Sequence, residues 1–138
     1  MAANTSQIFS KVADVQWVAS GLGANTATDG TGTTVLIFTA DATNGGRIER
    51  VQAMHLGTNV AGMLRFFVNN GATAATAGNN TLIEELAMPA NTVSQSAIAT
   101  PQVLLRVPII LPPGYTLRAA VTTAVAVGYQ ITAFGGKY

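Results

Sequence analysis

The chain has 138 residues, which is enough for one domain with a sizeable core and too short for two ordinary domains. Charged residues make up only 9% of it, against about 25% in typical soluble domains, and the net charge of +1 argues against nucleic acid or an anionic membrane as a partner. Hydrophobic residues make up 49%, so much of the surface is expected to meet other protein, and the lack of cysteine excludes disulfides and thiolate chemistry.

Residues 1–32 are predicted to form an N-terminal arm. The segment is rich in Ala, Asn, Thr and Gly and has no sustained periodicity, although DVQWVAS (residues 14–20) fits a short strand. A free tail has no reason to keep apolar side chains exposed, so we predict that those of the arm bind a partner protein: Ile8, Phe9, Val15, Trp17 and Val18. Two places are open to Trp17: the core of its own domain, or a neighbouring subunit. The N-terminus lacks the pattern of a secretory signal, so synthesis in the cytoplasm without export is expected.

Residues 33–138 are predicted to form an all-β domain of seven or eight strands without a convincing helix. The candidate strands are residues 33–40, 47–59, 61–71, 81–89, 103–111, 115–123 and 126–134. Phe66 and Phe67 are neighbours in one of them and point in opposite directions, so at least one belongs to the core. Many one-faced strands separated by turns are typical of an antiparallel two-sheet β-sandwich, with jelly roll as the favoured topology.

The strands after residue 102 show the clearest alternation of apolar and polar side chains. We predict that their apolar face is part of the core and that the following residues are buried there: Leu105, Val107, Leu117, Val121, Tyr129 and Ile131. Val125 and Val127 are expected on the same face. Arg106 and Arg118 fall on the opposite face and are predicted to lie outside the core. Pro113 and Gly114 suit the centre of a type II turn.

The sequence offers little for catalysis or for binding a cofactor or a metal. His55 is the single histidine, so a catalytic triad would have to include it and a His-rich metal site is impossible. Glu84 and Glu85 are adjacent and point to opposite faces of a strand, which argues against a facing carboxylate pair. The glycine-rich segments lack the Lys and the following helix of a phosphate-binding loop. We therefore expect no catalytic residue, no cofactor and no metal, and a function that is not enzymatic.

Nucleic acid and membrane are not expected as partners. Seven basic residues against six acidic ones cannot neutralise many phosphates. The longest uncharged run, residues 119–136, is about as long as a membrane span. Its Thr, Gln and Gly residues alternate with apolar ones at a period of two, which is typical of a half-buried strand.

Two segments resemble a known family. GGRIERVQAMHLGTNVAGMLRFFVNNG (residues 45–71) and IILPPGYTLRAAVTTAVAVGYQITAFGGKY (residues 109–138) are similar to small virion structural proteins of tailed bacteriophages, in which a strand, an LPxG turn and a Leu-rich strand recur. The resemblance covers residues 33–138. It implies a β-sandwich that decorates or cements the capsid, often as a homotrimer at a local threefold axis. Its implied partners are further copies of itself and the major capsid protein, and its implied location is the virion surface.

Two other functions remain open. Jelly rolls also occur in lectins, so a tail or fibre component that recognises a surface glycan is an alternative, with Trp17 or Tyr115 stacked on a sugar ring. An enzyme or a metal-dependent jelly roll is a third, although cupin-type sites need several His ligands and the chain has one.

Overall fold

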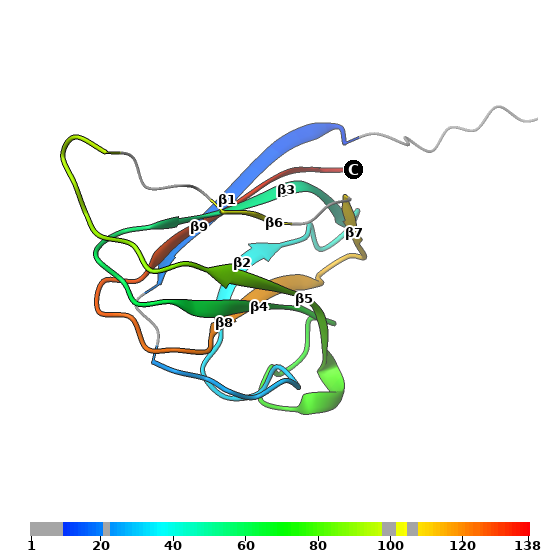
Figure 1. Cartoon of the computed structure of the whole chain (residues 1–138). Coiled ribbons are helices and arrows are strands. Elements are labelled where there is room, and N and C mark those ends of the chain that lie inside the picture. The colour runs from blue at the N-terminus through cyan, green and yellow to red at the C-terminus, as the bar shows by residue number, and fades with distance from the viewer. Residues whose placement is uncertain (1–9, 21–22, 98–101, 105–107) are drawn as a thin grey trace, which may run out of the picture.

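The computed structural model describes residues 10–20, 23–97, 102–104 and 108–138. These residues form two antiparallel sheets packed face to face, with no α-helix among them, which confirms the predicted β-sandwich (Figure 1). The strands are β1 (Val12–Ser20), β2 (Val35–Thr39), β3 (Gly46–His55), β4 (Gly62–Asn69), β5 (Asn80–Met88), β6 (Gln102–Leu104), β7 (Ile109–Leu111), β8 (Thr116–Val121) and β9 (Tyr129–Lys137), with a 3-10 turn η1 (Ala77–Asn79) before β5.

The chain crosses between the two sheets at nearly every step. The first sheet has the order β1-β9-β3-β6, with β7 also paired to β3, and the second has the order β2-β8-β4-β5. Among the described strands, only β4 and β5 are neighbours both in the sequence and within a sheet. Strands β1 and β9 pair without interruption, from Val12 opposite Lys137 to Ser20 opposite Tyr129. The first sheet therefore joins the two ends of the described chain and has β1 at its edge.

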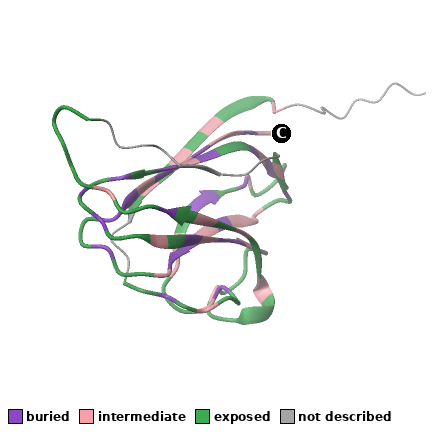
Figure 2. Ribbon diagram, in the orientation of Figure 1, coloured by how far each residue is buried: buried purple, intermediate pink, exposed green. Residues whose placement is uncertain are grey.

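The core lies between the two sheets. Figure 2 shows buried residues, in purple, along strands of both sheets. Strand β8 contributes Leu117 and Val121, and β9 contributes Tyr129 and Ile131, each with 0% of its surface exposed. Val125, in the loop between these strands, is also buried. The predicted burial is confirmed for these five residues, because period-two alternation assigns every second side chain of a strand to the same face.

Arg118 lies outside this core, as predicted. It is half-buried on the outer face of the second sheet, where its Nε donates a hydrogen bond to Thr34 Oγ1 at 3.0 Å. The remaining predictions of this kind fall outside the described residues: Leu105 and Val107 for the core, and Arg106 for the opposite face.

Two details of the C-terminal half differ from expectation. The single strand expected at residues 103–111 corresponds to two three-residue strands, β6 and β7, which begin at Gln102 and Ile109 and both pair with β3. Pro108, which has no N–H to donate to a ladder, lies between them. Val127 is 51% exposed rather than buried, because β9 begins only at Tyr129 and the φ of +91° at Gly128 interrupts the alternation.

The turn between β7 and β8 has the predicted type II form. Gly114 has a φ of +75°, and the N–H of Tyr115 donates to the Pro112 carbonyl at 3.1 Å. A positive φ at the third residue of the turn explains the glycine there, since a side chain would strain the backbone.

The boundary expected at residue 32 does not separate an arm from a sandwich among the described residues. Strand β1 belongs to the first sheet, where it pairs with β9 over its whole length of nine residues. The sequence analysis assigned these residues to the arm because only part of the strand, residues 14–20, showed a strand pattern.

The segment 23–34, of which residues 23–32 were assigned to the arm, lies against the outer face of the second sheet. The main-chain N–H of Asn25 donates to a carbonyl of β8 at 2.8 Å, and the guanidinium of Arg65 donates to the Thr26 carbonyl at 2.7 Å. Phe67 points away from the central core and is nevertheless 0% exposed. The segment lies on the same outer face, where Arg65 and Arg118 also bond to it.

Candidate partner-binding surface

Strand β1 divides the predicted partner-binding residues between its two faces. Val18 packs against the core, whereas Val15 and Trp17 point to solvent with 43% and 66% of their surface exposed. Trp17 therefore does not pack into the core of its own domain, which was one of its two open places. Ile8 and Phe9 lie outside the described residues. Partner binding by any of the five stays a prediction.

The outward row of β1 continues across the first sheet. Register places Phe134 of β9 beside Val15, and Arg50 of β3 on the other side of Phe134. The Arg50 guanidinium carbon lies 4.3 Å from the centre of the Phe134 ring, which is a cation–π contact. Trp17 has Thr132 as its neighbour in β9. The face thus combines exposed apolar groups with a cation and a hydroxyl, which suits a protein interface.

The other described arginines make contacts within the chain. Arg47 forms an ion pair with Glu49, and Arg65 Nε lies 2.7 Å from Glu85 Oε1. Arg118 donates to a threonine hydroxyl of the segment 23–34. The Arg47 pair lies within β3, whereas Arg65 and Arg118 connect strands of the second sheet to a neighbouring strand or to the segment 23–34.

His55 lies at the end of β3 and is buried against Tyr129. The two ring centroids are 5.2 Å apart at an interplanar angle of 64°, an edge-on contact. Burial lowers the pKa of His55 and raises the pKa of the Tyr129 hydroxyl. Within the described residues, neither ring nitrogen of His55 has a hydrogen-bond partner. The arrangement is an aromatic pair in which His55 packs edge-on against Tyr129.

The acidic residues are also separated. In β5, Glu84 pairs with Phe66 and Glu85 with Arg65, so the two carboxylates point to opposite faces as expected. Across the part of the chain that the structure describes, no three His, Asp or Glu residues lie close enough to hold a metal ion.

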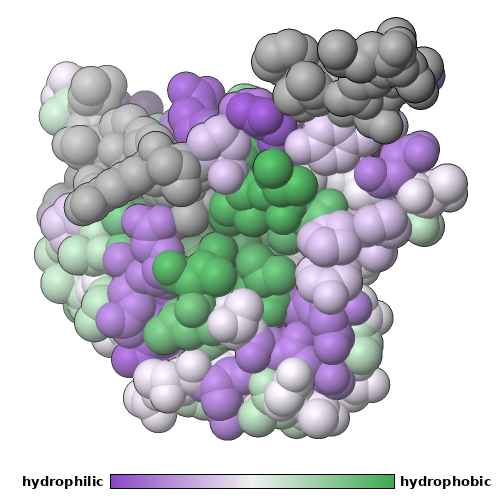
Figure 3. Space-filling view, turned by 90° about the vertical axis from the view of Figure 1, so that its right-hand side faces the viewer, coloured by the Kyte–Doolittle hydropathy of each residue, from purple (hydrophilic) through white to green (hydrophobic). Residues whose placement is uncertain are grey.

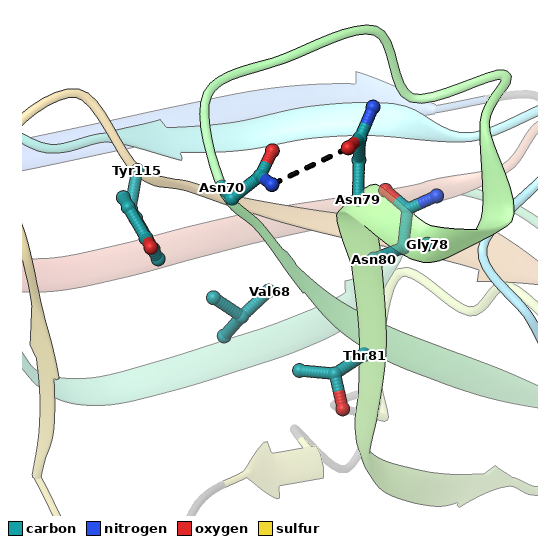
Figure 4. Close-up of a pocket in the computed structure, with 7 residues that line it drawn as sticks. All are labelled: Val68, Asn70, Gly78, Asn79, Asn80, Thr81 and Tyr115. Carbon is teal, nitrogen blue, oxygen red and sulfur yellow. Dashed lines mark hydrogen bonds between the residues drawn. The ribbon is translucent and has the colours of Figure 1, made fainter.

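A shallow pocket of about 190 Å³ lies at one end of the second sheet (Figure 4). It is lined by Val68, Asn70, Gly78, Asn79, Asn80, Thr81 and Tyr115. The amide Nδ2 of Asn70 donates to Asn79 Oδ1 at 3.3 Å, and Nδ2 of Asn79 and of Asn80 donate to main-chain carbonyls of the loop 71–76 at 2.9 and 2.8 Å. These amides hold the loop in place, so the hydrogen bonds of the asparagines explain the shape of the pocket without a ligand.

The pocket was not predicted, because residues 72–80 lie between two candidate strands, 61–71 and 81–89, and are mostly small residues without a strand pattern. The signal that was present is the pair of Asn-Asn steps on either side of the loop, at Asn69-Asn70 and Asn79-Asn80. Asparagine side chains commonly bond nearby main-chain groups in turns, and here they bond to each other across the loop ends as well.

A further apolar area lies on the side of the molecule where β7 is found. Ile110 of this short strand is 65% exposed. Figure 3 views the molecule from that side and shows hydrophobic side chains gathered in the middle of the face, with hydrophilic ones around them. The chain therefore exposes apolar surface on more than one side. None of the described residues belongs to a helix long and apolar enough to cross a membrane.

No family model matches the chain, and no curated protein matches it. Among solved structures it is similar to a chain of one described as "Cyanophage Pam1 capsid asymmetric unit", with a TM-score of 0.40 and 17% sequence identity, over 98% of this chain and 91% of that chain. A likeness at this level carries no argument about function, which therefore has to come from the residues themselves.

Proposed function

We propose that the chain is a structural virion protein of a bacteriophage, and that it decorates and cements the capsid. The observation that carries the proposal is the outward row of β1, where a tryptophan with 66% of its surface exposed and a valine with 43% lie on a regular strand. A rigid aromatic side chain on a flat surface is a typical anchor of a protein interface, and exposing it to water is unfavourable. The low charge of the chain and its resemblance to small virion proteins support the same function.

We further assign the sandwich to the jelly-roll class. Two sheets with the orders β1-β9-β3-β6 and β2-β8-β4-β5, joined by connections that cross from sheet to sheet, have the arrangement of two Greek keys. Proteins with this arrangement include viral capsid domains and lectins, so the topology is compatible with both functions considered for this chain.

The proposed partners are further copies of the chain, as a homotrimer, and the major capsid protein. The proposed location is the outer surface of the virion after synthesis in the host cytoplasm, and the proposed role is neither catalytic nor dependent on a cofactor. Of the five residues predicted to contact a partner, Val15 and Trp17 are the described ones that remain available, since Val18 packs into the core.

The proposal is tested by binding to capsids that lack the protein. Trp17→Ala and Val15→Ala should each weaken binding, and Trp17→Ala should weaken it by about tenfold or more, as expected for an aromatic anchor. Val127→Ala is the matched control, because Val127 is similarly exposed at 51% but lies in a loop rather than in β1. Unchanged affinity of both β1 variants would show that β1 is not the attachment surface, and no binding by the unmodified protein would contradict the capsid role.

Glycan recognition remains the second candidate function. The observation in its favour is that Tyr115 lines the pocket next to Asn70 and Asn79, a ring beside amides as in many sugar-binding sites (Figure 4). A glycan array with the unmodified protein and the Tyr115→Ala variant separates the two functions. Binding of a glycan that is lost in the variant would favour recognition over decoration.

A further inference from the structure

The free edge of β1 differs from every other edge of the sandwich. An exposed edge strand offers unpaired N–H and C=O groups to another strand, and proteins usually protect such an edge by shortness, bulges, proline or charge. Strand β1 has nine residues, pairs with β9 without a register shift and contains no proline. Its one charged residue, Asp14, accepts a hydrogen bond from Gln16 Nε2 at 3.0 Å.

The other described edges carry these protective features. Strands β6 and β7 have only three residues each. Strand β5 has a register shift in its pairing with β4 and carries Glu84 and Glu85. Strand β2 has five residues, and its end is occupied by the Gln16 side chain, which bonds to both main-chain polar groups of Thr39. Among the described edge strands, only β1 is both long and regular, and no described strand pairs with it on the side away from β9.

We infer that β1 pairs in antiparallel fashion with β1 of a second copy of this chain. When two strands of nine residues pair over their full length about a twofold axis, the axis passes through the middle residue, Gln16. Trp17 then lies opposite Val15 of the second copy, and Ala13 lies opposite Ala19. An aromatic side chain opposite a β-branched one is a favourable cross-strand pair, and here it joins the exposed Trp17 of one copy to the exposed Val15 of the other.

Charge favours a second copy in this register. Each Asp14 lies opposite Val18, and the two carboxylates are four residues apart along the joined strands, about 14 Å at 3.4 Å per residue. That separation exceeds the screening length of about 8 Å at physiological salt, so their repulsion is small. A register centred on Asp14 would instead place the two carboxylates directly opposite each other, which is unfavourable.

The contact is separate from the proposed homotrimer, but it uses Val15 and Trp17, which the proposed function assigns to capsid attachment. A β1 that is paired with a second copy is therefore not free to bind the capsid through these residues. A twofold contact joins copies in pairs, so it makes a dimer from monomers, or joins neighbouring trimers to each other. In either case the assembly contains an even number of chains.

The mass of the full-length protein in solution tests the inference through two matched variants. Ala13→Lys/Ala19→Lys places a lysine opposite a lysine twice in the paired strands and should halve the mass measured by light scattering. Ala13→Lys/Ala19→Glu places opposite charges at the same positions and should keep the mass of the unmodified protein. Both alanines are exposed, so circular dichroism should show the same β content in all three proteins. An odd-numbered unmodified assembly, or the same mass for both variants, would overturn the inference.

The register is tested by disulfide formation, since the chain has no cysteine of its own. A mixture of Val15→Cys and Trp17→Cys proteins should form mixed disulfide dimers more efficiently than either protein alone, because the two positions face each other only between copies. A mixture of Trp17→Cys with Leu36→Cys is the control, since Leu36 is exposed on β2. Equal yields in both mixtures would contradict the pairing.

Discussion

Gln16 of β1 binds the main chain of Thr39 in β2 through both ends of its side-chain amide. Its Nε2 donates to the Thr39 carbonyl at 2.9 Å, and its Oε1 accepts from the Thr39 N–H at 2.9 Å. An amide side chain thus replaces a neighbouring strand at this point. The contact joins the edge of the first sheet to the edge of the second.

Replacing Gln16 by alanine should therefore weaken the connection between the sheets. The N–H and C=O of Thr39 would then form hydrogen bonds with water in place of the Gln16 amide. We therefore expect the free energy of unfolding to fall by about 1 kcal/mol, as for a pair of solvent-accessible hydrogen bonds. Urea unfolding measures the change. Gln52→Ala is the control, because Gln52 lies on the outer face of β3. An equal loss in both variants would mean that the amide contact adds nothing specific.

Gly135→Ala should destabilise the first sheet strongly. A Cβ at this position would lie 2.0 Å from the main-chain oxygen of Arg47 in the neighbouring strand β3, so the backbones would have to separate. We expect a loss of roughly 2–4 kcal/mol, the range of severe overpacking. Gly78→Ala is the matched control, since a Cβ at Gly78 meets no atom within 4 Å. Thermal unfolding of the two variants should differ clearly, and similar melting temperatures would contradict the close approach of β9 and β3.

Stability should decline in mild acid because of His55. Burial holds the pKa of His55 below its ordinary value of 6.5, so the unfolded chain binds a proton more readily than the folded one. The free energy of unfolding should therefore be constant above about pH 6.5 and fall as the pH drops below it. In His55→Phe, which keeps an aromatic ring beside Tyr129, this decline should disappear.

The carboxylates provide the internal control for that experiment. Main-chain hydrogen bonds from Asn44 and Thr43 lower the pKa of Asp41 below 3.8. Hydrogen bonds from Thr31, first from its side-chain hydroxyl and then from its main-chain N–H, lower the pKa of Asp29. Their stabilising effect is present above about pH 3.8 and is lost only at lower pH, in both proteins. A decline between pH 6.5 and 4 that persists in His55→Phe would show that His55 is not its source.

Phe67→Ala tests whether the segment 23–34 is part of the folded domain. Phe67 has no exposed surface, and removing a fully buried phenylalanine costs about 3–5 kcal/mol. Leu36→Ala, on the same outer face but 44% exposed, should cost less than about 1 kcal/mol. Chemical denaturation distinguishes these results. If Phe67→Ala lowers the free energy of unfolding by as little as Leu36→Ala does, the segment 23–34 does not pack over Phe67.

The central sandwich was predictable from the sequence because its strands have one buried face. In β8 and β9, each buried residue is followed by one that faces the other way, and Leu117, Val121, Tyr129 and Ile131 all lie where alternation places them. Gly114 was predictable for a related reason, since Pro-Gly at a turn centre implies a positive φ.

Features that depend on contacts between distant segments were not predictable in the same way. Neither the burial of Phe67 on the outer face nor the hydrogen bonds between the segment 23–34 and the second sheet follow from a pattern in the sequence. The place of β1 depends on pairing with β9, at the other end of the described chain. For the candidate surface, the sequence indicated Val15 and Trp17 as apolar residues without a core, but only the register shows that both face outward.

The pairing of β1 with β9 also determines when the protein can complete its fold. During synthesis β1 leaves the ribosome before every other described strand, and its partner β9 leaves after all of them. Each nascent chain must therefore hold an unpaired strand with an exposed tryptophan until translation has passed β9. Closure of the first sheet is a late, long-range step, of the kind that slows folding and exposes intermediates to wrong partners. In a cell that makes many copies at once, an unpaired β1 can pair with β9 of a neighbouring chain. Expression level and temperature should therefore affect the yield of protein in which β1 pairs with its own β9.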